Sequence, residues 1–395
     1  MIYLLYFSLS FLISFFVTDR VQSFLFLCIF TFLFTSLSFP AGGDWIGYFQ
    51  HYDCIVNEKC YSDFVFFEPG YEILVKLLGI FGFQTIIVFI GFFNIFFIGL
   101  YAKRFDRPAL IVLFFSCVFL WSLYIEAIRQ SLAISLILLG IIYLRKNEIK
   151  KFIFIVFLAS FFHVTAFVSL IFTLPYFSIK CSRIFGYGLL AFSFIFIVNP
   201  VMILEAFLSV LPQDSMVHAK LQFYLMSDVY KPKISIGLGT ILDLFLVFIV
   251  LLSFFRVRKN NLINDYRFHT IVFLGVVLYF SFSVFIGRMM PVMTRIGWYG
   301  FPFVLMLVYL NIGKSYFYNK NNSNPRKDLV SILIVIFFLA QVFRPLTYNY
   351  SRYSILHQET IVENINNLDD LSLRIEADKK CSILTTLGHG YLCNN

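Results

Sequence analysis

The sequence has no motif for binding a nucleotide and none for binding a metal ion. A glycine-rich phosphate loop, a dinucleotide fingerprint, a G-x-S-x-G motif and His/Cys groups at metal-ligand spacing are all missing. These absences argue against nucleotide hydrolysis as an energy source within the chain. We therefore predict no cofactor and no metal site.

The sequence also has no polar stretch long enough to form a soluble domain. Only 13% of its 395 residues are charged, 60% are hydrophobic, and the mean hydropathy is +0.84. Lipid accommodates this much apolar surface, and it forces backbone groups to bond within helices. The composition predicts an all-α fold, with a polytopic transmembrane helical bundle over residues 1–345 and an extracytoplasmic tail over residues 346–395.

The first apolar stretch lacks the marks of a cleaved signal peptide. It starts at Ile2 without a basic segment and without an A-x-A site, which predicts a retained span. The net charge of +9 could suggest a nucleic-acid partner, but the lysines and arginines lie mainly in short loops between apolar runs. That is the positive-inside pattern of membrane proteins, so no nucleic-acid partner is expected.

The apolar stretches predict about 11 spans, since a span needs about 20 mostly apolar residues. They are Ile2–Val17, Val21–Phe39, Phe83–Tyr101, Pro108–Tyr124, Ile128–Leu144, Phe152–Phe177, Ile184–Val198, Ile236–Phe255, Phe268–Gly287, Ile296–Gly313 and Leu329–Phe343.

Four basic loops are expected on the cytoplasmic side. They contain Lys103, Arg104 and Arg107; Arg145, Lys146, Lys150 and Lys151; Arg256, Arg258 and Lys259; and Lys314, Arg326 and Lys327. Between the second and third loops lie three apolar stretches, an odd number, so one of them must turn back or fail to cross.

The stretch Phe152–Phe177 is the best candidate to turn back. It is long for one span and short for two, and its centre carries the polar residues Ser160, His163 and Thr165. Irregular backbone at that depth is tolerated where it lines a cavity. We predict a broken or re-entrant helix near His163; the alternative is one tilted helix.

The predicted outer loops, about 40–82, 199–235 and 288–295, and the tail contain two close cysteine pairs. Cys54 with Cys60, and Cys381 with Cys393, would lie on the oxidising side, where disulfides form. The alternative is that all four are free thiols.

The first outer loop combines carboxylates with aromatic rings. Aromatic rings stack on sugars while carboxylates accept hydrogen bonds from hydroxyl groups, so Asp44, Trp45, Tyr48, Glu68 and Glu72 could bind a sugar. The alternative is an interfacial loop with an aromatic belt and solvated acids.

Three arginines on the outer side could hold a phosphate. Arg129 lies at the outer mouth of a span, near Glu126, and Arg288 and Arg295 occupy a short loop where positive charge is disfavoured. Arg295 also begins the next helix, whose N-terminus attracts anions. The alternatives are snorkelling for Arg129 and pairing with outer-loop acids for the other two.

Two further polar residues lie within apolar stretches. His163 could act as a general base or bind diphosphate, or it could be structural. Asp243 is a functional candidate inside a span, or it pairs with a neighbouring helix.

The order of these motifs resembles the EpsG-like family of polysaccharide polymerases, which includes the Wzy-type O-antigen polymerases. The matching features, over roughly the first 180 residues, are Gly43-Asp44 with Tyr48, Glu68-Pro69-Gly70-Tyr71-Glu72, Ile128-Arg129-Gln130-Ser131-Leu132-Ala133 and Leu158-Ala159-Ser160-Phe161-Phe162-His163. The C-terminal half is similar only in general plan.

The resemblance implies an enzyme of the bacterial inner membrane, a glycosyltransferase with its active site facing the periplasm. It would join oligosaccharide repeat units carried on undecaprenyl diphosphate, and a chain-length regulator protein is a possible partner. His163, Asp44, Glu68 and Arg129 are then the expected catalytic residues. Arg288, Arg295, Tyr48, Glu72 and Trp45 are expected to bind diphosphate or sugar.

Mechanistically, the arginines would neutralise the leaving diphosphate, and His163, Asp44 or Glu68 would take the proton of the acceptor hydroxyl. A flippase or transporter of lipid-linked oligosaccharide is the main alternative. A transporter would be expected to carry charge along a central membrane pathway, whereas these charges gather at one face. A membrane acyltransferase and a structural subunit are further alternatives.

Overall fold

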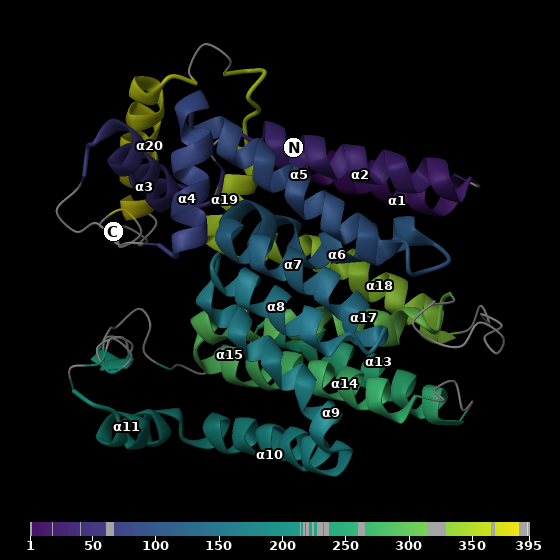
Figure 1. Cartoon of the computed structure of the whole chain (residues 1–395). Coiled ribbons are helices and arrows are strands. Elements are labelled where there is room, and N and C mark those ends of the chain that lie inside the picture. The colour runs from purple at the N-terminus through teal and green to yellow at the C-terminus, as the bar shows by residue number, and fades with distance from the viewer. Residues whose placement is uncertain are drawn as a thin grey trace. The chain divides into compact units, whose positions relative to one another are not determined.

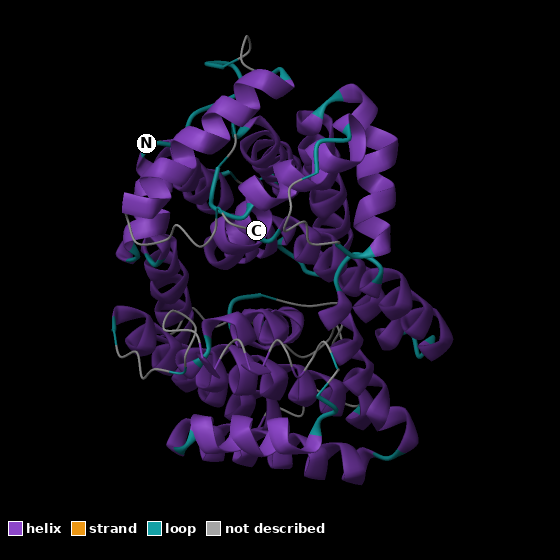
Figure 2. Cartoon of the chain, turned by 90° about the vertical axis from the view of Figure 1, so that its left-hand side faces the viewer, coloured by secondary structure: helices purple, strands orange, loops and turns teal. Residues whose placement is uncertain are grey.

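Helices are the regular elements of the described chain, as the computed structural model in Figures 1 and 2 shows. An isolated antiparallel bridge joins Ser38 and Thr360. The structure describes all residues except 1, 18, 40, 61–66, 214, 216–217, 219–220, 223–224, 227–231, 233–236, 260–264, 314–328, 365–367, 387–392 and 394–395. The side chains of residues 238, 255–259 and 350 are also outside the description.

The chain forms two compact units. Unit 1 contains residues 1–167, 313–317 and 335–395, and unit 2 contains residues 168–312 and 318–334. Two helices continue from one unit into the other, the 3₁₀ helix η3 (Val164–Thr173) and α18 (Leu329–Phe343).

Unit 1 holds most of the first half of the chain and the C-terminal residues. Its elements are α1 (Ile2–Phe16), α2 (Arg20–Leu37), α3 (Trp45–Asn57), α4 (Pro69–Leu78), η1 (Gly79–Phe81), α5 (Phe83–Ala102), α6 (Pro108–Phe119), η2 (Leu120–Glu126), α7 (Ile128–Arg145), α8 (Ile149–Ser160), η7 (Pro345–Thr347), α19 (Asn349–Leu356) and α20 (Asp370–Thr386).

Unit 2 is built around α10 and α14. Its elements are α9 (Leu174–Phe177), α10 (Ile179–Val198), α11 (Pro200–Val210), α13 (Leu238–Lys259), α14 (Tyr266–Leu278), η4 (Tyr279–Ile286), α15 (Gly287–Met289), η5 (Pro291–Met293), α16 (Thr294–Gly297), η6 (Trp298–Gly300) and α17 (Phe301–Tyr309).

Seven helical segments of the described chain are long and apolar enough to cross a membrane. They are Arg20–Leu37, Phe83–Ala102, Pro108–Glu126, Ile128–Arg145, Ile179–Val198, Tyr266–Met289 and Pro291–Tyr309. The predicted all-helical membrane fold is therefore confirmed. The remaining spans of the predicted eleven stay predictions.

A polar contact joins two of these helices in the core of unit 1. Helix α7 packs against α5, and the buried amide of Asn94 in α5 donates to the hydroxyl of Ser131 at 2.8 Å. The hydroxyl of Ser135 donates back to the Asn94 carbonyl oxygen at 2.8 Å. Such contacts stabilise helix pairs in lipid by about 0.6 kcal/mol each. They fix the first turns of α7, which carry Arg129.

The segment predicted to break does so near His163. Helix α8 ends at Ser160, residues 161–163 form a turn, and the chain continues as the 3₁₀ helix η3 and then α9. The interruption is shown, whereas a reversal across the membrane stays a prediction.

In the described parts of each unit, a π-helical segment comes shortly before an arginine. In unit 1, α6 continues as η2, which ends at Glu126, three residues before Arg129. In unit 2, α14 continues as η4, which ends at Ile286, two residues before Arg288. Such π-helical turns occur often at functional sites.

Candidate functional site

The centre of the candidate site in unit 1 is an ion pair between Arg129 and Glu68, in which Arg129 Nη1 donates to Glu68 Oε2. Arg129 lies in the first turn of α7, where the helix dipole disfavours a cation, and the Glu68 carboxylate offsets this. Glu68 has an extended backbone because Pro69 follows it and begins α4. Both side chains are about one-fifth exposed, at 19% and 18%.

Aromatic rings hold the Arg129 guanidinium in place. Its central carbon lies 3.8 Å from the centroid of the Phe67 ring and 5.8 Å from that of Tyr48. The Phe67 ring in turn contacts the rings of Tyr71 at 5.7 Å and His51 at 4.5 Å. Stacked, ion-paired arginine of this kind is suited to bidentate recognition of phosphate.

The loop that carries Glu68 is attached to the helix break at His163. Glu68 Oε1 accepts a hydrogen bond from the backbone N–H of Val164 at 3.2 Å, and the Gly70 N–H donates to the Phe161 carbonyl at 2.8 Å. A Cβ atom on Gly70 would lie 2.7 Å from that carbonyl oxygen, so glycine is required for this approach. The Glu68–Gly70 loop thus links Arg129 to the backbone on either side of His163.

The imidazole of His163 has a defined hydrogen bond. Its Nδ1 lies 2.6 Å from the hydroxyl oxygen of Thr165. A hydroxyl can donate to or accept from an imidazole nitrogen, so this contact fixes the orientation of the ring, and the His163 tautomer depends on which of the two groups donates. The arrangement is chemically suited to general base catalysis.

The other predicted residues of the first outer loop have contacts of their own. Asp44 precedes α3 and provides no side-chain cap, and the Trp45 ring is buried with the Lys380 amine 5.6 Å from its centroid. Glu72 forms an ion pair with Lys76 at 2.7 Å on the surface of α4. Tyr48, which was also predicted, contacts Arg129 through its ring.

Helix α20 braces α3, which carries Tyr48. The fully buried carboxylate of Asp53 accepts two hydrogen bonds from the Arg374 guanidinium, at 2.9 and 2.5 Å. Asp370 accepts from the Tyr52 hydroxyl at 3.1 Å and from the Asn57 amide at 2.8 Å. Burial, together with Asp370, raises the pKa of Tyr52 well above its usual range.

The structure joins both predicted cysteine pairs as disulfides on these two helices. The Cα atoms of Cys54 and Cys60 are 4.2 Å apart, and those of Cys381 and Cys393 are 5.6 Å apart. Cys54 lies in α3 and Cys381 in α20, so each bond closes a loop at the end of a braced helix.

The two remaining predicted arginines belong to unit 2. Arg288 in α15 forms an ion pair with Asp243 in α13, whose side chain is 3% exposed. The alternative that Asp243 pairs with a neighbouring helix is therefore confirmed. Arg295 lies in the four-residue helix α16. This helix belongs to the continuous helical segment Pro291–Tyr309, so Arg295 lies near the N-terminus of that segment, as predicted.

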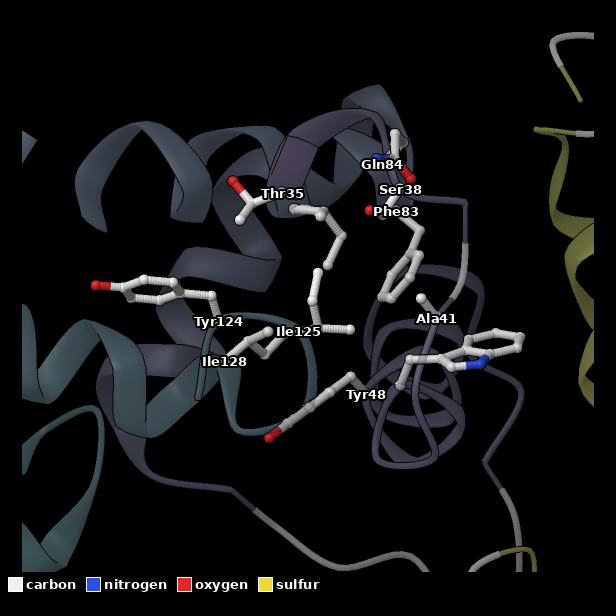
Figure 3. Close-up of a pocket in the computed structure, with 11 residues that line it drawn as sticks. Thr35, Ser38, Ala41, Tyr48, Phe83, Gln84, Tyr124, Ile125 and Ile128 are labelled. Carbon is white, nitrogen blue, oxygen red and sulfur yellow. The ribbon is translucent and has the colours of Figure 1, made fainter. Parts of the chain in front are cut away.

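A small cavity lies beside the site in unit 1 (Figure 3). Its volume is about 30 Å³, enough for water but not for a sugar ring. It is lined from the ends of α2, α3 and α5 and from the η2–α7 junction, by Thr35, Ser38, Ala41, Trp45, Tyr48, Phe83, Gln84, Ile87, Tyr124, Ile125 and Ile128.

Sequence reasoning missed several contributors to the site. Phe67 was considered only as part of a loop, and Thr165 only as a polar residue at depth. The alternation of Glu68 with aromatic residues around a Pro-Gly turn was the one available signal for Phe67 and Tyr71. Within the described residues no group of three or more His, Cys, Asp or Glu side chains is placed to hold a metal ion.

Seven membrane-length helices and a polar cluster where helices begin and break define an integral membrane protein with a candidate active site. The model of the EpsG family matches residues 21–355, and the chain belongs to this family. Membership indicates a polysaccharide-polymerase-like membrane protein, with glycosyltransferase-like activity. No curated protein and no solved structure matches the chain.

Proposed function

We propose that this protein polymerises oligosaccharide repeat units carried on undecaprenyl diphosphate, as Wzy-type O-antigen polymerases do. The observation that carries the proposal is the convergence of Arg129, Glu68 and the helix break at His163. A cation for a leaving diphosphate and a base for an acceptor hydroxyl are the two groups that inverting transfer requires. The energy for the new glycosidic bond comes from the lipid-diphosphate-linked donor, which agrees with the lack of nucleotide-binding motifs in the sequence.

Within this proposal each residue has a distinct role. Arg129 binds the leaving diphosphate and neutralises the charge that develops on it. His163 takes the proton from the acceptor hydroxyl. Glu68 is a positioning residue, because one of its oxygens contacts Arg129 and the other accepts from the Val164 N–H. Asp44 stays a second candidate for the base, and Tyr48, Trp45 and Glu72 for sugar contacts.

The proposed location is the bacterial inner membrane, with this site facing the periplasm. Four shorter apolar segments, Ile2–Phe16, Val164–Phe177, Gly239–Phe254 and Leu329–Phe343, would bring the seven membrane-length helices to the eleven spans predicted. Val164–Phe177 would then be the second half of a re-entrant helix. The disulfides Cys54–Cys60 and Cys381–Cys393 suit an oxidising compartment on that side.

A lipopolysaccharide ladder tests this function in a deletion strain. Wild type should restore the ladder, and Arg129→Lys, which keeps the charge but loses the planar fork and much of the stacking on Phe67, should not. Arg352→Ala is the matched control in unit 1, because Arg352 is exposed and hydrogen-bonds only locally to Asn349.

The result that would overturn the proposal is equally specific. A deletion strain that loses all surface polysaccharide, with lipid-linked units retained inside the cell, would identify a flippase. A full ladder from Arg129→Lys at equal membrane abundance would show that the planar guanidinium and its stacking on Phe67 are not needed, while leaving the polymerase function intact.

A further inference from the structure

Tyr71 is a buried tyrosine whose hydroxyl has no hydrogen-bond partner within the described residues. Its side chain is 0% exposed, and it lies in the first turn of α4, three residues after Glu68. Its backbone N–H donates to the Glu68 carbonyl at 3.0 Å, which fixes its position relative to the ion pair. A buried hydroxyl without a partner destabilises the folded protein, and phenylalanine at this position would avoid that cost.

Two other buried tyrosines of unit 1 do have a hydrogen-bond partner for their hydroxyl. The Tyr3 hydroxyl donates to the Val342 carbonyl at 2.9 Å, and the Tyr6 hydroxyl lies 2.7 Å from that of Thr31. The Tyr124 hydroxyl, like that of Tyr71, is buried and has no hydrogen-bond partner within the described residues. Tyr71 differs from Tyr124 in its position beside the Arg129 cation.

A second unpartnered donor lies at the same place. Nε of Arg129 is buried and has no hydrogen-bond partner in the described parts of the chain, although Nη1 of the same side chain is paired with Glu68. Phe67 and Tyr48 contact both Arg129 and Tyr71, with ring centroids 5.7 Å from that of Tyr71. Burial and the neighbouring Tyr48 raise the pKa of the Tyr71 hydroxyl, and the charge of Arg129 lowers it.

We propose that Tyr71 and Nε of Arg129 form a subsite for one phosphate oxygen of the lipid diphosphate. An arginine Nε–H is a donor and carries no acceptor, and a tyrosine hydroxyl can donate. Two donors and a positive charge select an anionic acceptor oxygen over a neutral sugar hydroxyl. The inference rests on the proposed function, and it adds a substrate-binding residue to that site.

The test uses the full-length protein, with undecaprenyl diphosphate as the probe and the uncharged polyprenol of the same length as its control. Tyr71→Phe should bind the diphosphate about tenfold or more weakly than wild type, as expected for one lost hydrogen bond to a charged group. It should bind the polyprenol equally well. Its melting temperature without ligand should be unchanged or higher, because an unsatisfied hydroxyl has been removed.

Tyr3→Phe is the matched control, because it removes a hydroxyl that is hydrogen-bonded. It should lower the melting temperature and leave diphosphate affinity unchanged. Equal diphosphate affinity of Tyr71→Phe and wild type would overturn the subsite, and so would a lower melting temperature of Tyr71→Phe.

Failure of the subsite is distinguishable from failure of the function. If wild type restores the polysaccharide ladder and Tyr71→Phe restores it equally, the function stands and the subsite is wrong. If wild type binds no diphosphate and restores no ladder, both are wrong.

Discussion

The site is made by residues that are individually ordinary and acquire a role through their contacts. Arg129 was predicted from its place at a span mouth, where Glu126 is its nearest acidic residue in the sequence. In the structure the ion pair of Arg129 is with Glu68, 61 residues earlier, while the Glu126 carboxylate accepts from the Trp121 indole at 2.9 Å. The sequence shows which residues can form an ion pair. Which of them are partners, when they lie far apart in the chain, is known only from the fold.

Thr165 is expected to position the His163 ring for proton transfer. Thr165→Val keeps the side-chain shape but removes the hydroxyl 2.6 Å from His163 Nδ1. We expect polymerisation to fall about tenfold, a part of the roughly 100- to 10,000-fold that a placed general base contributes. The pH profile of the rate should also differ from that of wild type. Thr165→Ser, which keeps the hydroxyl, should restore both the rate and the pH profile.

The measurement is the rate of polymerisation against pH with purified lipid-linked repeat units. Thr85→Val is the control, since the Thr85 hydroxyl donates to the Phe81 carbonyl of the preceding helix η1 and does not contact His163 in the described residues. An unchanged rate and pH profile for Thr165→Val would show that the hydroxyl has no part in orienting the imidazole.

Lys380 is expected to make stability depend on pH. Burial lowers the pKa of its amine to about 8, although the nearby carboxylates of Glu376, Glu126 and Glu359 raise it. An unfolded lysine keeps its proton up to about pH 10.4, so between these values the unfolded chain binds more protons and stability rises with pH. Lys380→Met should therefore lose the part of this rise that lies between pH 8 and 9.5.

Melting temperatures of wild type and Lys380→Met, measured from pH 7 to 9.5, provide the comparison. The melting temperature of wild type should increase relative to that of Lys380→Met as the pH increases. A constant difference would mean that Lys380 is protonated throughout this range in the folded protein.

At the scale of elements, the apolar runs defined most helices closely. The spans predicted as Phe83–Tyr101 and Ile128–Leu144 are the helices Phe83–Ala102 and Ile128–Arg145. Their ends are local properties, set by where charged loops begin. The π-helical segments η2 and η4 were not predicted, because an extra residue in a turn leaves the apolar pattern almost unchanged.

The docking of α20 on α3 was also beyond prediction, since Asp53 and Arg374 are separated by 321 residues. Arg374→Ala should destabilise the protein by about 3–5 kcal/mol, because it leaves a buried carboxylate without its cation. Thermal unfolding and limited proteolysis near α20 would measure this effect.

Lys379→Ala is the control on the same helix. Its amine pairs with Glu376 at 3.3 Å on an exposed surface, so we expect a change of about 0.5 kcal/mol or less. Equal effects of the two variants would show that the Asp53–Arg374 pair does not hold α20 on α3.

For the whole molecule, the composition was sufficient to predict a helical membrane protein, and the order of motifs was sufficient to predict the family. The two compact units were not predicted, because both are built from the same kind of apolar helix and no polar linker marks the boundary at residue 167.

Counting the free cysteines of the whole chain tests the two disulfides. Three are free, Cys28, Cys117 and Cys181, and four are in disulfides. Protein that is denatured without a reductant and treated with a maleimide should gain three labels by intact mass, and seven after reduction. A gain of five or seven labels before reduction would contradict one or both disulfides.

The contact between Gly70 and the carbonyl of Phe161 bears on how this protein tolerates genetic drift. A hydrogen bond to a main-chain oxygen is indifferent to the side chain that the residue carries, and the Phe161 side chain is 51% exposed. Position 161 should accept many replacements, whereas position 70 should accept glycine alone. Homologous chains should thus vary freely on one side of this contact and remain invariant on the other.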